Sequence, residues 1–189
     1  MNILEYVNGK LGGAIRHSED PTPAIAASEE HTLMGAAIPA ALAGLYLHGG
    51  SIQEVGAVTQ LVKTQSDLSA ITDTRILEIL FDDKQDAVAR SVAAYAGSSV
   101  EDASRALSRA GREGIRALQE HFKGKEVTEK EISVYLLSQR SHILPYLPAH
   151  IQLGRLLERE EIDDVVHKMT GPVSGAMQKI GDMFTRPKS

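Results

Sequence analysis

The sequence predicts an all-α protein, and three observations lead to this class. Apolar residues recur at spacings of three and four through most of the chain, which is the period of helices with one buried face. Glycines and capping residues stand where these segments begin and end. No run of useful length alternates between apolar and polar residues, as half-buried strands do. We therefore expect a compact bundle of roughly seven to nine helices.

The composition favours one helical core. A chain of 189 residues with 42% hydrophobic and 24% charged residues is ordinary for a soluble globular protein. Only 4% of the residues are aromatic and none is Trp, so the core must consist of small aliphatic side chains, which suit close helix packing. The net charge of −5 does not favour nucleic-acid binding, which usually requires a basic face. The chain has no cysteine, which excludes disulfides, thiol catalysis and cysteine metal sites.

The segment GAAIPAALAGLYLHGG, residues 35–50, decides whether the chain enters a membrane. Residues 32–47 carry no charge, but they are rich in Ala and Gly and contain Pro39 near their centre. A membrane span needs about 20 apolar residues, so we expect a buried helix here. The N-terminus has an early Glu5 and no basic start, so it does not resemble a secretory signal. We accordingly expect no transmembrane segment and a cytoplasmic location.

Glycine stops, prolines and capping boxes set the expected helix boundaries. In a capping box, a serine or threonine and a glutamate three residues later each satisfy a free backbone N–H, and such boxes are expected at residues 51–54, 98–101 and 128–131. Pro39 should kink its helix because it removes one backbone donor. We expect helices over residues 1–11, 28–47, 51–63, 75–81, 84–96 and 100–122, with short, proline-interrupted helices from residue 128 onward.

Three segments together resemble a bacterial family of unknown function, the YidB-like domains. They are AAIPAALAGLYLHGGS at 36–51, ILEILFDDKQDAVARSVAAYAGSSVEDASRAL at 76–107, and VTEKEISVYLLSQRSHILPYLP at 127–148. Their order and spacing match the family across residues 1–157. The resemblance implies a compact helical bundle of bacterial origin. It implies no activity, because the family has no established reaction or catalytic residues.

The chain departs from the YidB-like pattern in two places. Charged sequence such as DTRILEILFDDKQ replaces the glycine-rich linkers of the family, and residues 158–189 extend beyond the matched region. We therefore expect a helical domain over residues 1–157 and a helical tail over residues 158–189. Some members of the family are joined to cell-envelope modules, so the resemblance also implies an envelope-associated role as an alternative.

Two groups of residues are candidates for catalysis or metal binding. His142 and His150 flank a turn with two prolines and could converge on one ion, although histidines at helix ends also interact favourably with terminal carbonyls. Beside Asp163, the residues Asp164 and His167 have the spacing of carboxylate–histidine pairs in di-iron bundles, but the chain has no second pair. Common hydrolase, phosphate-binding and dinucleotide-binding motifs are lacking. We therefore assign no catalytic, cofactor-binding or metal-binding residue.

Two patterns indicate interaction surfaces. Basic residues at helical spacing form a stripe, which could contact an anionic partner or pair with the acidic segments 78–86 and 158–164. Apolar residues in the tail form a narrow seam, which either folds back on the bundle or docks on a second copy or another protein. The arginine stripe comprises Arg105, Arg109, Arg112 and Arg116, and the tail seam comprises Val173, Met177, Ile180 and Phe184.

The sequence thus favours a non-enzymatic function. We expect a bacterial helical interaction or scaffold module that binds a protein partner or associates with itself through its tail. No cofactor is expected, and no small-molecule ligand is identified. The alternatives are an enzyme of unrecognised type, with His142 and His150 as its centre, and an envelope-associated accessory protein.

Overall fold

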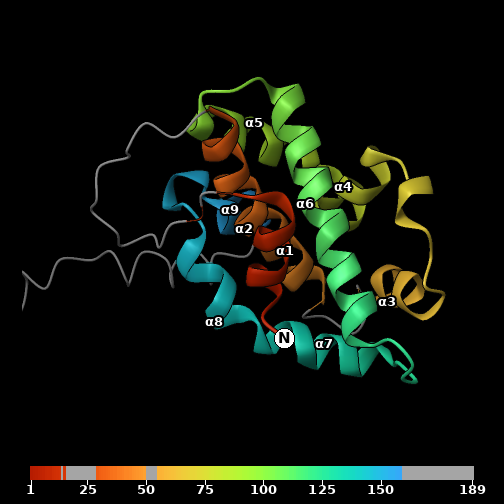
Figure 1. The fold of residues 1–189 in the computed structure, drawn as a ribbon. Helices are drawn as coiled ribbons and strands as arrows, with labels where there is room; N and C mark the ends of the chain where they lie inside the picture. Colours follow the sequence, from red (N-terminus) through yellow and green to blue (C-terminus); the bar gives the residue numbers. More distant parts are fainter. Residues whose placement is uncertain (14, 16–28, 50–54, 159–189) are drawn as a thin grey trace, which may run out of the picture.

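The protein is all-α in the computed structural model, which describes residues 1–13, 15, 29–49 and 55–158 (Figure 1). These residues form nine α-helices and four short 3-10 helices, with no strand among them. The α-helices are α1 (Ile3–Leu11), α2 (Glu29–Gly49), α3 (Gly56–Lys63), α4 (Asp73–Phe81), α5 (Gln85–Ala96), α6 (Val100–His121), α7 (Glu129–Ser138), α8 (Arg140–Ile143) and α9 (Leu153–Leu156). The 3-10 helices are η1 (Leu68–Ala70), η2 (Asp82–Lys84), η3 (Leu144–Tyr146) and η4 (Ala149–Ile151). The predicted fold class is confirmed.

Helix α2 runs through the middle of the bundle and packs most extensively against α6 (Figure 1). Residues 36–38, 40–43 and 45 are fully buried, so this helix is covered on all sides, as its uniformly apolar sequence requires. The uncharged segment is therefore a central core helix. None of the described helices has a stretch long and apolar enough to cross a bilayer.

Small residues allow the helices around α2 to approach closely. A Cβ atom added at Gly44 would lie 2.5 Å from the ring of Phe81 and 2.8 Å from the carbonyl oxygen of Leu80. At Gly111 of α6, an added Cβ would lie 2.3 Å from Leu80 Cδ1. Because any larger residue would collide with α4, these glycines permit the close contact of α2, α4 and α6. The helix α2 continues through Pro39, from Glu29 to Gly49.

The boundary between α5 and α6 differs from the prediction by one residue. The sequence predicted Ser98 as the cap, in a box with Glu101, but Ser99 caps α6 by accepting a hydrogen bond from the Asp102 N–H at 3.0 Å. The reason is that Ser98 still belongs to the end of α5. Its N–H donates to the carbonyl oxygen of Ala93 at 3.0 Å and closes that helix after Gly97, which has a φ of 68°.

Other boundaries agree with the prediction where the structure describes them. Thr128 and Glu131 form the expected capping box at the start of α7. Gly12 ends α1 in the left-handed conformation, with a φ of 68°. The predicted box at residues 51–54 lies outside the described residues, and α3 is described from Gly56 to Lys63.

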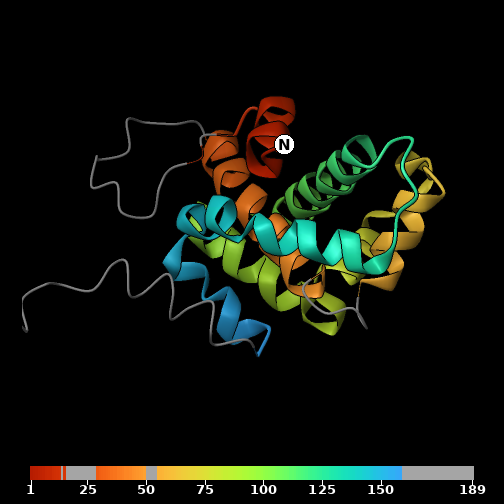
Figure 2. The ribbon, with the colours of Figure 1, turned by 90° about the horizontal axis from the view of Figure 1, so that it is seen from below.

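Helix α7 crosses one end of the bundle, where the N-terminus also lies (Figures 1 and 2). Two hydrogen bonds join these distant parts of the sequence. The Tyr135 hydroxyl donates to the carbonyl oxygen of Met1 at 3.0 Å, and the Ile3 N–H donates to Gln139 Oε1 at 3.0 Å. The second bond is buried, so the first turn of α1 is fixed to the junction of α7 and α8.

Candidate binding surfaces

The predicted arginine stripe lies on α6, and three of its four members have partners nearby. Arg105 pairs with Glu101 at 3.2 Å and with Asp102, both on the same helix. Arg116 pairs with Glu113, one turn away. The pairs of Arg105 are largely exposed, and such pairs contribute little to stability, whereas the Glu113 side chain that pairs with Arg116 is mostly buried.

Arg112 is turned toward the protein and joins α6 to the segment before α4. Its guanidinium donates to the Ile71 carbonyl oxygen at 3.0 Å and to Asp73 Oδ1 at 2.8 Å. The fully buried hydroxyl of Ser108 donates to the same oxygen of Asp73. Arg112 therefore has a structural role.

The alternative pairing of the stripe with acidic segments is wrong for the described residues. The predicted partners were the segments 78–86 and 158–164, of which residues 159–164 lie outside the described residues. The stripe pairs instead with acids on α6 and with Asp73. Glu78 pairs with Arg75, and Glu158 pairs with Lys84.

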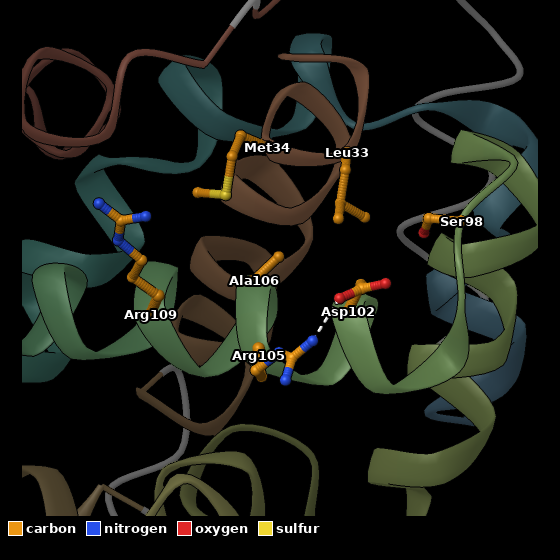
Figure 3. A pocket seen from close by; sticks show the side chains of 7 residues that line it. All are labelled: Leu33, Met34, Ser98, Asp102, Arg105, Ala106 and Arg109. Atoms are coloured by element: carbon orange, nitrogen blue, oxygen red, sulfur yellow. Dashed lines mark hydrogen bonds and ion pairs between the residues drawn. The ribbon is translucent and has the colours of Figure 1, made fainter. Parts of the chain in front are cut away.

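Arg109 differs from the rest of the stripe and lines a pocket between α2 and α6 (Figure 3). Its side chain has no hydrogen-bond or ion-pair partner in the part of the chain that the structure describes. The cavity has a volume of about 460 Å³. Its lining combines apolar side chains of both helices with charged side chains of α6. The residues are Leu33, Met34, Asp102, Arg105, Ala106 and Arg109, with Ser98 at the edge.

The two ends of this α2–α6 pocket differ in charge. A hydrogen bond from the Ser99 hydroxyl and a second from Arg105 hold the pKa of Asp102 below its ordinary value, so this carboxylate is ionised at neutral pH. Asp102 in turn raises the pKa of Arg105. Arg105 is thus engaged by Asp102 and by Glu101, whereas Arg109 places a positive charge at the other end of the pocket.

A second surface, on the outer side of α7, did not emerge from the sequence. Val134 and Leu137 are 58% and 47% exposed and stand one helical turn apart on α7. Large apolar side chains with that much exposure mark contact surfaces when they stand together. We call Val134 and Leu137 the α7 face. The signal in the sequence was the presence of apolar residues both on the inner and on the outer side of this helix.

The α7 face borders a groove lined by three packed aromatic rings. His121 stacks on Tyr135 with the ring centroids 4.2 Å apart, and Phe122 meets both rings edge-on. Burial raises the pKa of Tyr135 to about 12, so its hydroxyl stays protonated and donates to Met1. Burial also lowers the pKa of His121, with a further contribution from the charge of Lys125. The groove has a volume of about 700 Å³.

Among the described residues, the predicted catalytic candidates do not form a metal centre. His142 lies in α8 and His150 in η4, and both are exposed. The ring centroids of His150 and Tyr95 lie 6.3 Å apart. Within the described ranges, no three His, Asp or Glu side chains gather as metal ligands. Asp163, Asp164 and His167, and the tail seam of Val173, Met177, Ile180 and Phe184, lie outside the described residues.

Comparison with known proteins gives no matching family model, no matching curated protein and no matching solved structure. The YidB-like resemblance therefore stays a prediction from the sequence.

Proposed function

We propose that this chain is a non-enzymatic helical interaction module that associates with a second copy of itself through the α7 face. The observation that carries the proposal is the exposure of Val134 and Leu137 one helical turn apart. Removing these side chains from water on association is favourable in proportion to the apolar area covered.

The form of the surface supports a second copy as the partner. The commonest oligomers are two-fold dimers, in which the same patch occurs on both sides of the interface. The α7 face offers projecting aliphatic side chains next to an aromatic groove formed by Phe122, Tyr135 and His121. Each copy thus supplies both a ridge and a recess, which is what packing of a helix against its own equivalent requires.

The test is the mass of the full chain in solution. We expect a concentration-dependent dimer in sedimentation velocity at micromolar protein, and a monomer for the double variant Val134→Asp, Leu137→Asp, because two charges would have to be buried. The matched control is Val100→Asp, which alters a residue that is 43% exposed at the first position of α6, where an acid is favourable. Circular dichroism verifies that each variant keeps its helices.

The outcomes separate this proposal from the tail prediction. A chain that ends at residue 158 should remain dimeric if the α7 face is the interface, and should become monomeric if the tail seam is the interface. A full chain that stays monomeric at millimolar concentration, or a double variant that stays dimeric, contradicts the proposal.

The bacterial origin, the YidB-like relationship and the cytoplasmic location form part of this proposal and rest on the sequence segments described above. Fractionation of bacterial cells that express the full chain would test the location.

A further inference from the structure

We propose that the α2–α6 pocket binds a small amphiphilic monocarboxylate, with the carboxylate on Arg109 and the aliphatic chain on Leu33, Met34 and Ala106. This proposal concerns a different surface from the α7 face and does not depend on self-association.

The floor of the pocket suits an aliphatic chain. Leu33 and Met34 project from α2 toward α6, and Ala106 lies between them on the facing surface of α6 (Figure 3). The cavity of about 460 Å³ lies in the range of small-molecule sites, which are mainly apolar with a few fixed polar groups. Met34 has an unbranched, flexible side chain that can adapt to an aliphatic ligand.

Arg109 supplies the polar group that fixes one end of the ligand. Of the two arginines in the pocket, Arg105 is already engaged by Asp102 and Glu101, whereas Arg109 has no partner in the described ranges. A guanidinium presents parallel N–H donors that match the two oxygens of a carboxylate. Figure 3 shows the side chains of Met34 and Arg109 at the same end of the pocket, so the anionic group and the apolar floor are adjacent.

The opposite end of the pocket limits the charge and length of the ligand. The carboxylate of Asp102 faces the cavity there, beside Ser98 (Figure 3). A ligand with a second negative charge would meet this carboxylate, so a single carboxylate is favoured over a dianion. Residues 102–109 span about 10 Å of the helix axis, which suits a chain of medium length. Among the described residues that line the pocket, none is aromatic, so they offer no platform for a nucleotide base.

The experiment is a titration of the full chain with decanoate, followed by calorimetry and by amide chemical shifts. We expect saturable binding with the largest shifts at residues 33, 34, 106 and 109. The variant Arg109→Gln should weaken binding about tenfold, because a charge-assisted pair is lost. The matched control Arg90→Gln alters an exposed arginine in the middle of α5, outside the pocket, and should bind decanoate as the unaltered chain does.

Three further probes identify what the site recognises. Decanol tests the carboxylate and should bind more weakly than decanoate, while Ala106→Leu tests the floor and should reduce decanoate binding by filling the cavity. Inorganic phosphate should not displace decanoate. The proposal is overturned if decanoate produces no saturable shift, if Arg109→Gln and Arg90→Gln bind it equally, or if phosphate displaces it, which would show a general anion site.

Discussion

Arg112 on α6 donates a hydrogen bond of 2.8 Å to Asp73 at the first position of α4. The same guanidinium also donates to the Ile71 carbonyl oxygen at 3.0 Å, just before that helix. One arginine thus satisfies a carboxylate and a backbone acceptor of a segment about forty residues earlier in the chain. It positions the start of α4 against the longest helix of the bundle.

Replacing this arginine should destabilise the fold. We expect Arg112→Ala to lower the free energy of unfolding by about 1–3 kcal/mol, because the part-buried carbonyl oxygen of Ile71 loses its donor and Asp73 loses its ion pair. The control Arg75→Ala removes a largely exposed pair with Glu78 within α4 and should cost less than about 1 kcal/mol. Urea unfolding measures both values. Equal losses in the two variants would show that Arg112 is not a structural link.

Two serine variants test whether Ser99 or Ser98 caps α6. Ser99→Ala should lower the free energy of unfolding by about 1 kcal/mol, because the Asp102 N–H loses its acceptor. The neighbouring Ser98→Ala should have a smaller effect, since its backbone N–H, which closes α5, is retained. Thermal unfolding of the two variants compares them directly. A larger loss for Ser98→Ala would place the cap at the position that the sequence predicted.

Two glycines in helices should respond to alanine with opposite signs. Gly44→Ala should destabilise the protein by about 1–3 kcal/mol, because the new methyl group would meet the Phe81 ring and the Leu80 carbonyl oxygen. Gly9→Ala in α1 meets nothing within 4 Å and should stabilise the protein by about 0.5–1 kcal/mol through helix propensity. A urea midpoint that does not fall for Gly44→Ala would contradict the close packing of α2 and α4.

His121 should make stability depend on pH. Its pKa in the folded protein lies below the ordinary value of 6.5, mainly because of burial, so the folded state binds a proton less readily than the unfolded state. The contribution is fully favourable above pH 6.5 and is lost as the pH falls below that value. We expect the melting temperature to fall between pH 7.5 and pH 5.5, and to fall less in His121→Gln. A ring titration followed by NMR with a midpoint above 6.5 would contradict the sign.

The helical architecture was predictable because its signals are local. The three- and four-residue spacings, the left-handed Gly12 and the Thr128 box each act within a few residues, and the structure reproduces them. The register at Ser98 and Ser99 was not predictable, because both serines are good caps and the choice depends on which N–H closes α5. Local chemistry offered two equal candidates.

The surfaces were predictable only in part. The spacing placed the arginines on one side of α6, but it could not show that Arg112 turns to Asp73 while Arg109 stays unpaired in the described ranges. Arg112 turns to Asp73 because the start of α4 lies beside Ser108 and Arg112 of α6. The α2–α6 pocket joins residues 33 and 34 to residues 98–109, and no periodic pattern connects segments so far apart.

The bond between the Tyr135 hydroxyl and the carbonyl of Met1 has a practical result for work in the laboratory. A purification tag fused ahead of Met1 would emerge beside Tyr135, which lines the aromatic groove next to the α7 face, and its bulk would hinder association there. The mass of the chain in solution is therefore best measured without a tag or with a tag fused after Ser189.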